Sequence, residues 1–288
     1  MTTKEYLDQW LATFVEPFRA VNTAACYRRA INALPAAVMA CPLDQLNGLT
    51  LQAAINHQST KHPRAAQLTY AMLHAALGKA VELGLLLRSP LAGCIKPKHT
   101  AQRAAVLSLE QLSAYITAAR SQPAFPLLLL MATCGLRRGE ALGLMWQDIT
   151  GDNLSICRQR VRTSQGYSVC ALKSKASRRV LPLAPPIAAE LARIRVRSFT
   201  GWVCDCTPET LRKQHRAALA AADLPGITLH GLRHSMATAA AADGCPIKIL
   251  QGILGHARYQ LTADLYADHL LPENYAPSMA NLAAAMMV

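Results

Sequence analysis

The sequence predicts a mainly α-helical protein with a small antiparallel β-sheet, and three observations carry this prediction. The first hundred residues show helix-capping signals and apolar residues at helical spacing, with almost no alternating strand pattern. The segment from Asp148 to Leu183 alternates and contains turn residues, which is typical of short strands. A length of 288 residues with 52% hydrophobic and 16% charged residues fits about two globular domains and excludes wholesale disorder.

The N-terminal part is expected to be a helical domain over residues 1–95. Thr2 and Glu5 have the spacing of a capping box, which opens a helix extending through Phe14. Apolar periodicity predicts three further helices, over residues 23–38, 50–57 and 64–83.

A basic segment follows this domain. After Ser89-Pro90, the chain carries Lys96, Lys98 and Arg103 among proline and polar residues. Such a composition is typical of a solvated connection, so we expect a linker over residues 96–104 and a second domain over residues 105–288.

The second domain is predicted to combine helices with one sheet. Ser108 and Gln111 form another capping box, which opens a helix to about Arg120. Turn signals at residues 151–153 and 164–166 divide the alternating segment into a three-stranded antiparallel sheet. The remaining predicted elements are helices, over residues 126–133, 207–222, 230–243, 246–254 and 261–268.

The charge of the chain favours a polyanionic partner. Thirty Lys and Arg against seventeen Asp and Glu give a formal net charge of +13. Nucleic acid is the first candidate and an anionic membrane surface the second. The longest apolar runs fall far below the ~20 residues that span a bilayer, and the N-terminus lacks the apolar stretch of a secretion signal. We therefore expect a cytoplasmic protein with a nucleic-acid partner and no membrane partner.

The cysteines and histidines do not form a recognisable metal motif. Nine scattered cysteines are interpreted as reduced thiols that mostly fill the core. Cys204 and Cys206 are close in sequence but lack a second pair at zinc-finger spacing. His230 and His234 have the spacing of a metalloprotease helix, but Gly231 stands where that motif needs a glutamate.

Four short segments of the second domain gain meaning from their combination. They are Gly135-Leu136-Arg137 with Glu140, His230 with Arg233, Leu254-Gly255-His256, and Tyr266. Alone, each is typical of a solvated helix start, a helix cap or an amphipathic helix. Together they resemble, in order and separation, the motifs of the tyrosine recombinases, the phage-integrase family of site-specific DNA recombinases.

The resemblance implies a fold and a reaction. The fold would be an N-terminal helical core-binding (SAM-like) domain followed by an α+β tyrosine-recombinase catalytic domain. The reaction would be cleavage and rejoining of duplex DNA through a covalent 3′-phosphotyrosine, with strands exchanged between two sites, as in DNA integration by mobile elements. It needs neither a metal nor a nucleotide cofactor. The residues that match the family's catalytic positions are Arg137, Lys173, His230, Arg233, His256 and Tyr266, with Glu140 in support.

These residue types suit the chemistry. Two guanidinium groups can stabilise the charge that develops on a phosphate, and Glu140 would orient the first of them from one turn away. A phenol with a pKa near 10 is a poor nucleophile unless cations or a base assist it. A lysine would protonate the 5′-hydroxyl leaving group, while His230 would act as base and proton shuttle and His256 as a further hydrogen-bond donor to the phosphate.

Three alternatives remain open in the sequence. Counting back from Pro182 favours Lys173 as the general acid, but Lys175 is the alternative because this turn varies in length among relatives. Tyr259 and Tyr275 compete with Tyr266 for the role of nucleophile but fit the spacing less well. The alternative functions are a type IB topoisomerase-like enzyme that relaxes DNA and a non-catalytic recombinase-like DNA-binding protein.

The expected partners follow from the resemblance. They are double-stranded DNA, further copies of the chain in a synaptic tetramer on DNA, and optionally an accessory DNA-bending protein. The tail after Tyr266 is apolar, and it would cover either its own core or a neighbouring protomer. The residues expected to contact DNA outside the catalytic set are Lys96, Lys98, Arg103, Arg138, Lys175 and Arg178.

Overall fold

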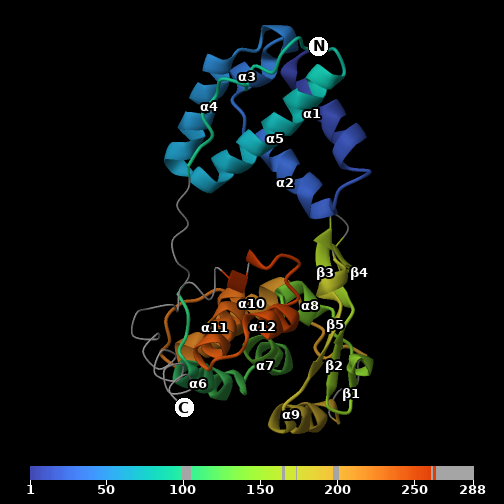
Figure 1. Cartoon of the computed structure of the whole chain (residues 1–288), viewed down its shortest axis with the longest axis vertical. Coiled ribbons are helices and arrows are strands. Elements are labelled where there is room, and N and C mark those ends of the chain that lie inside the picture. The colour runs from blue at the N-terminus through green and yellow to red at the C-terminus, as the bar shows by residue number, and fades with distance from the viewer. Residues whose placement is uncertain (99–104, 164–165, 173, 197–200, 261, 264–288) are drawn as a thin grey trace, which may run out of the picture. The chain divides into compact units, whose positions relative to one another are not determined.

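A computed structural model describes residues 1–98, 105–163, 166–172, 174–196, 201–260 and 262–263 (Figure 1). The chain forms two compact units, Met1–Gln102 and Arg103–Val288, which we call the N-terminal and C-terminal units. Helices dominate both units, and antiparallel strands occur in the C-terminal one, so the predicted fold class is confirmed. Among the helices of the described residues, none is both long and apolar enough to cross a bilayer.

The N-terminal unit is a group of helices around one apolar core. The predicted capping box opens α1: Thr2 Oγ1 accepts from the Glu5 backbone N–H at 3.2 Å, and Glu5 accepts from the Thr2 N–H at 2.8 Å. Leu7, Ile31, Ile55 and Leu73 are among the fully buried side chains that join the helices. The helices are α1 (Thr3–Trp10), α2 (Val21–Asn32), α3 (Ala36–Ala40), α4 (Gly48–Lys61) and α5 (Pro63–Glu82).

Two of the predicted helices of this unit have different bounds. The predicted helix over residues 23–38 is wrong in its second half, because the chain breaks at Pro35 and begins α3 there. Proline has no N–H to donate and clashes with the preceding turn, so a continuous helix cannot pass through this position. The predicted helix over residues 50–57 is too short: α4 begins at Gly48, after Asn47 accepts a hydrogen bond from the Thr50 N–H at 3.0 Å.

The C-terminal unit is built around α7. Every residue of α7 except Thr133 is buried, and α6, α8 and α11 pack against it. The Ser108–Gln111 capping box that opens α6 is confirmed, with bonds of 3.2 and 3.0 Å. The helices are α6 (Leu109–Ala119), α7 (Phe125–Cys134), α8 (Arg138–Leu142), α9 (Pro185–Arg195), α10 (Pro208–Ala221), α11 (Leu229–Ala242) and α12 (Ile247–Leu254). Helix α9, which begins with two prolines, is not predicted by the sequence.

Within the described residues the strands form two antiparallel sheets, whereas the sequence analysis predicts one. A three-stranded sheet has the order β1 (Ile149–Thr150), β2 (Asn153–Ile156) and β5 (Arg179–Pro182). A separate two-stranded hairpin, β3 (Arg158–Thr163) with β4 (Gly166–Ala171), lies between β2 and β5 in sequence.

The hairpin is separate from the sheet because the sheet packs side chains into the core, whereas the hairpin is more exposed. Leu154 and Leu181 face each other across β2 and β5 and are buried, so that sheet packs against the core. Strand β3 has no fully buried residue. Alternation alone does not distinguish a strand of the packed sheet from a strand of an exposed hairpin.

The cysteines are free thiols, as expected, and six of the nine belong to the apolar cores or pack against them. All nine lie in the described part of the chain, and Cys134 is the only one that is fully buried.

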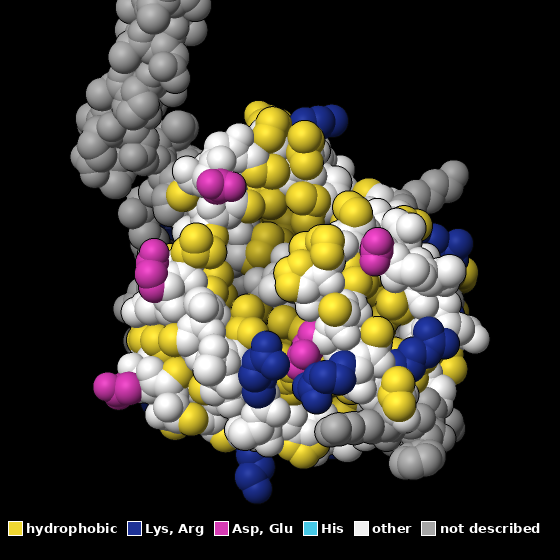
Figure 2. All heavy atoms as spheres, turned by 90° about the horizontal axis from the view of Figure 1, so that it is seen from below, with side chains coloured by type: hydrophobic (Ala, Val, Ile, Leu, Met, Phe, Trp, Pro, Cys, Tyr) yellow, Lys and Arg dark blue, Asp and Glu magenta, His cyan; other side chains and the backbone are white. Residues whose placement is uncertain are grey.

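The face of the molecule in Figure 2 carries Lys, Arg, Asp and Glu side chains scattered among apolar and neutral ones. The cationic surplus therefore does not form a single basic patch on that face.

Candidate active site

Two helices of the C-terminal unit end in a glycine with left-handed backbone conformation. Gly135 follows α7 with φ 63°, and Gly255 follows α12 with φ 62°. Both conformations are unfavourable for residues with a Cβ atom, so glycine is the natural residue there. The last carbonyl groups of a helix have no partner inside it and form the negative end of its dipole. These two helix ends therefore offer acceptors for cations.

Arg233 binds both of these helix ends. It lies on α11 and is 2% exposed. Its Nη1 donates to the Gly135 carbonyl and its Nη2 to the Leu254 carbonyl, each at 2.7 Å. Burial and the nearby positive charge of Arg137 lower the pKa of Arg233 to about 9, so its guanidinium remains charged at neutral pH.

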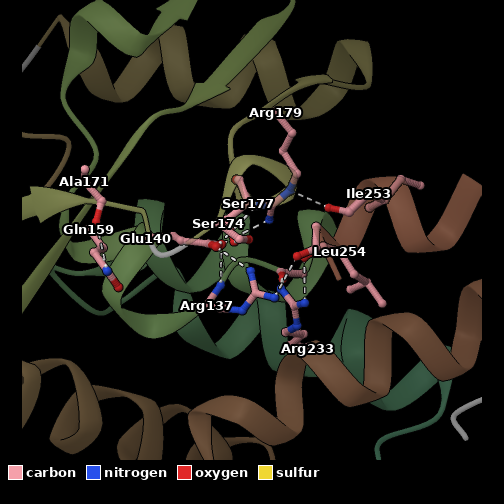
Figure 3. Close-up of polar contacts among 12 residues, drawn as sticks. Arg137, Glu140, Gln159, Ala171, Ser174, Ser177, Arg179, Arg233, Ile253 and Leu254 are labelled. Atoms are coloured by element: carbon pink, nitrogen blue, oxygen red, sulfur yellow. Dashed lines mark hydrogen bonds and ion pairs between the residues drawn. The ribbon is translucent and has the colours of Figure 1, made fainter. Parts of the chain in front are cut away.

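Arg137 lies beside Arg233, at the start of α8 (Figure 3). Its Nη2 donates to the Gly255 carbonyl at 2.9 Å, and its Nη1 donates to Glu140 at 2.7 Å. Glu140 also accepts from the Arg137 backbone N–H at 3.0 Å, so a single carboxylate holds both the main chain and the side chain of this arginine. The predicted contact between Arg137 and Glu140, one helical turn apart, is present.

Glu140 has a second arginine partner, Arg179 on β5, which the sequence analysis does not single out. Arg179 donates to the two carboxylate oxygens at 3.3 and 3.1 Å. Burial would raise the pKa of Glu140, but the hydrogen bonds and charges of Arg179 and Arg137 outweigh it and hold the pKa below its usual value. Two guanidinium groups, those of Arg137 and Arg179, thus share one buried carboxylate.

The sequence analysis names Arg178 as a DNA contact and does not single out Arg179, because the two neighbours have the same residue type and charge. Arg178 is exposed, whereas the Arg179 side chain is only 7% exposed. The alternation of β5 contains the signal that could have found it: Arg179 lies two residues before the buried Leu181, and such residues share one face of a strand.

The predicted histidines lie near the two arginines. His230 is at the start of α11, and its ring packs at right angles against that of His234, with 4.6 Å between centroids. Desolvation and the charges of His234, Arg233 and Arg137 lower the pKa of His230 to about 4. Desolvation and the charges of Arg233 and Arg137 lower that of His256 to about 4 as well. Both rings are therefore neutral at neutral pH and can accept a proton.

The remaining predicted residues are divided between exposed positions and undescribed ones. Lys173, Tyr266 and Arg103 lie outside the described residues, and Lys175 begins a short 3-10 turn at Lys175–Ser177. Tyr259, the competing nucleophile, is 53% exposed. Of the residues predicted to contact DNA, Lys96 and Lys98 are exposed in the N-terminal unit, and Arg138 and Arg178 are exposed in the C-terminal unit.

A pocket of about 560 Å³ opens beside Arg137 and is lined by further cations. Arg212 and Arg216 of α10, together with Arg138, contribute to its wall. Its lining includes His215, which is buried and accepts from the Tyr115 hydroxyl at 2.8 Å while donating to the Ile227 carbonyl at 2.9 Å. Burial lowers the pKa of His215, which favours the neutral imidazole that can accept from Tyr115. The described part of the chain contains no group of three His, Cys, Asp or Glu side chains placed to hold a metal ion.

The sequence has named relatives that cover part of its length. It is 32% identical to Tyrosine recombinase XerC of Rhodospirillum centenum over 205 residues, which are 65% of this chain and 55% of that protein. It is 31% identical to Prophage integrase IntF of Escherichia coli K12 over 165 residues, 52% of this chain and 32% of that protein. The chain thus spans about half, or less, of the length of these curated relatives.

The fold resembles that of solved integrases bound to DNA. The Tn1549 transposon integrase in complex with a circular intermediate DNA aligns with TM-score 0.84 and 17% identity, covering 98% of this chain and 99% of that one. A lambda integrase tetramer bound to a Holliday junction aligns with TM-score 0.72 and 19% identity, covering 90% of this chain and 78% of that one. These likenesses concern the fold.

A sequence model described as the phage integrase family matches residues 105–271, more than half of the chain, including the segments that hold Arg137, His230, Arg233 and His256. With Arg137 and Arg233 bound to two glycine-capped helix ends, this match shows that the chain belongs to the phage integrase family.

Proposed function

We propose that this protein is a site-specific DNA recombinase that cleaves and rejoins duplex DNA through a covalent 3′-phosphotyrosine. It exchanges strands between two DNA sites and requires no metal or nucleotide cofactor. The relatives named as tyrosine recombinases and integrases support this proposal, as does the likeness of the fold to DNA-bound integrases.

The observation that carries the proposal is the charge of the site. Arg137, Arg179 and Arg233 together carry three positive charges, and among the described residues Glu140 is the one carboxylate bonded to this cluster. The pKa of Arg233 is lowered because these positive charges are close together and buried. A phosphate placed against Arg137 and Arg233 would supply the missing negative charge, and their N–H groups suit its oxygens.

The reaction conserves the number of phosphodiester bonds. The Tyr266 oxygen attacks phosphorus and loses its proton, while the bond from phosphorus to the 5′-oxygen breaks. The leaving oxygen takes a proton from the general acid, Lys173 or alternatively Lys175. Arg137 and Arg233 stabilise the charge on the non-bridging oxygens. A 5′-hydroxyl from another strand then reverses the step and releases the tyrosine, so no external energy source is consumed.

His230 and His256 assist at the same phosphate. In the site without DNA, both imidazoles have a pKa of about 4 and are neutral at neutral pH. A neutral His230 can accept the proton of the nucleophile. The charge of a bound phosphate would raise both pKa values and favour hydrogen-bond donation from His256.

The proposal extends to organisation and partners. Residues 1–95 would form a DNA-binding core-binding domain, 96–104 a basic linker and 105–288 the catalytic domain. Lys96, Lys98, Arg103, Arg138, Lys175 and Arg178 would contact the duplex backbone, which gives a salt-dependent affinity. Recombination would take place in a tetramer on DNA in the nucleoid, with or without an accessory DNA-bending protein.

The decisive experiment uses a nicked suicide duplex that spans the junction of the genetic element encoding the chain. We expect a covalent protein–DNA adduct on a denaturing gel with the wild-type protein and none with Tyr266→Phe. Tyr259→Phe is the matched control and should retain the adduct. An adduct that survives Tyr266→Phe and disappears with Tyr259→Phe would assign the nucleophile to Tyr259.

The general acid is identified by changing the leaving group. Lys173→Ala should slow cleavage strongly but spare a substrate whose leaving group is a 5′-thiol, because a thiolate departs without protonation. If the 5′-thiol substrate restored cleavage by Lys175→Ala and not by Lys173→Ala, the general acid would be Lys175. Relaxation of supercoiled DNA without exchange between any paired sites would favour a topoisomerase-like enzyme over a recombinase.

A further inference from the structure

Three consecutive carbonyl groups at the end of α12 are each bound by a different arginine. The Ile253 carbonyl accepts from Arg179 at 2.6 Å, and the Leu254 carbonyl accepts from Arg233 at 2.7 Å. The Gly255 carbonyl accepts from Arg137 at 2.9 Å. The three arginines come from β5, α11 and the start of α8, so three separate elements meet on one helix end immediately before His256 (Figure 3).

Arg179 differs from the other two arginines in its surroundings. Its Nε binds Ile253, and its two terminal nitrogens bind Glu140 and the Ser177 carbonyl, the latter at 3.0 Å. All three nitrogens are thus engaged by protein acceptors, and the side chain is 7% exposed against 35% for Arg137. A phosphate would reach Arg137 more readily than Arg179.

Glu140 links Arg179 to the arginine proposed to bind phosphate. The carboxylate is 2% exposed and is shared between Arg137 and Arg179. A buried carboxylate with two guanidinium partners has its position determined from both sides. Without Arg179, Glu140 would remain bonded to Arg137 alone, and one side of the carboxylate would lose its charged donor.

The turn after α12 packs closely against Arg179. A Cβ atom at Gly255 would lie 3.0 Å from the Ala176 carbonyl oxygen and 3.0 Å from Nη1 of Arg179. A side chain at residue 255 would therefore crowd the turn against Arg179. Arg179 holds this end of α12 through its hydrogen bond to the Ile253 carbonyl.

We propose that Arg179 is a positioning residue for catalysis: by joining Glu140 to the Ile253 carbonyl, it keeps Arg137 and the Gly255–His256 turn in the geometry that DNA cleavage requires. It does so without contacting the DNA. This inference rests on the proposed function for its catalytic consequence, whereas its structural part concerns the protein alone.

The matched control is Arg158. It is also a partly buried arginine, the first residue of β3, 22% exposed, and it binds the buried Asp148 at 2.6 Å. The bonds recorded for Arg158 do not reach α12. Arg158→Gln therefore removes an arginine from a buried carboxylate without touching the end of α12, and it should reproduce any general loss of stability.

The first measurement is amide hydrogen exchange of the protein without DNA. Arg179→Gln should accelerate exchange in residues 251–256, because the Ile253 carbonyl and Glu140 lose their donor. Arg158→Gln should leave that segment unchanged. Equal exchange there in Arg179→Gln and wild type would overturn the proposal, whether or not the protein cleaves DNA.

The second measurement is single-turnover cleavage of the nicked suicide duplex at saturating DNA. We expect the rate constant of Arg179→Gln to fall about 100-fold, as for a misplacement of about 1 Å at a reacting centre, with the Kd for DNA unchanged. Arg179→Lys keeps the charge but not the fork of donors and should be intermediate. Unchanged cleavage by Arg179→Gln would contradict the inference, whereas absence of an adduct with wild-type protein would contradict the proposed function.

A third readout separates positioning from general damage to the fold. A scissile methylphosphonate has one fewer negative charge and depends less on an oriented guanidinium. If Arg179 acts through Arg137, the deficits of Arg179→Gln and Arg137→Ala should shrink together on this substrate. A deficit of Arg179→Gln that is identical on both substrates would indicate a merely structural role. Should Arg179→Gln fail to fold, Arg179→Lys serves for all three measurements.

Discussion

The arginines of the candidate active site and those of the β3–β4 hairpin carry the same charge in different environments. In the site, Arg179 and Glu140 are 7% and 2% exposed. On the hairpin, Arg162 is 73% exposed and its partner Glu209, on α10, is 49% exposed, while Arg160 pairs with a half-exposed Asp205. Exposed pairs contribute about 0–1 kcal/mol, whereas removing one partner of a buried pair costs about 3–5 kcal/mol. Burial of both partners distinguishes the Arg179–Glu140 pair, because hairpin Arg160 is itself only 19% exposed and its partner is the more exposed of the two.

The largest effect is expected for Arg233→Ala. It removes a donor from the proposed phosphate site, which costs about 100- to 1,000-fold in cleavage rate for a comparable electrostatic contact. It also leaves the Gly135 and Leu254 carbonyls without this donor. We expect a loss of stability of about 1–3 kcal/mol for each carbonyl that stays unsatisfied, measured by urea denaturation. Cleavage at the wild-type rate would remove the distinction between buried and exposed arginines.

Gly255→Ala tests the close packing of the α12 end against β5. Residue 255 has φ 62°, and its Cβ would lie 3.0 Å from the Ala176 carbonyl oxygen. The left-handed conformation alone costs about 1–2 kcal/mol for a residue with a Cβ. Gly244→Ala is the control, because Gly244 has φ 80° after α11 but no atom within 4 Å of such a Cβ. A greater loss of thermal stability for Gly255→Ala than for Gly244→Ala measures the crowding at residue 255. Equal losses of stability for the two variants would exclude such crowding.

Acidification should destabilise the protein without DNA. His230 and His256 have a folded pKa of about 4, below the ordinary 6.5, and the pKa of buried His215 is lowered too. Between pH 6.5 and 4 the unfolded chain binds protons that the folded protein does not, so the free energy of unfolding falls as the pH decreases. Denaturation at several pH values should show a smaller slope for His230→Gln. A phosphate bound to the site would also reduce the slope, whereas a slope of opposite sign would contradict the cationic site.

The smallest effect is expected on the hairpin. Arg162→Ala removes an exposed pair with Glu209 at 3.4 Å, so the stability should change by less than about 1 kcal/mol. Cleavage at saturating DNA should also be unaffected, since Arg162 has no bond to the site residues among its recorded contacts. A fall in the cleavage rate constant of Arg162→Ala as large as that of Arg179→Gln would show that the hairpin takes part in catalysis.

Local signals in the sequence were sufficient for the capping of helices and for the two glycine turns. The capping boxes at Thr2 and Ser108 and the helix ends at Gly135 and Gly255 depend on residues within a few positions of each other. The break at Pro35 is local too and could have been predicted from the missing N–H of proline. The separation of the hairpin from the sheet could not, because it depends on which strands pack against the core.

The contact between Arg137 and Glu140 was predictable because it joins residues three apart on one helix. The role of Arg179 was not, because its partners Glu140 and Ile253 are 39 and 74 residues away in sequence. Two adjacent arginines in β5 are equivalent in composition and charge. Only the packing of α8 and α12 decides that one is buried and the other exposed.

By itself, the sequence determined the helix caps, the family motifs and the cationic surplus, since these depend on residue type and short spacings. The tertiary structure decided which cations form the site. It brings three arginines from three elements to consecutive carbonyls of α12, where helix-end acceptors and one buried carboxylate offset the cost of desolvating their charge. That compensation depends on contacts between residues distant in sequence, and such contacts exist only once the chain has folded.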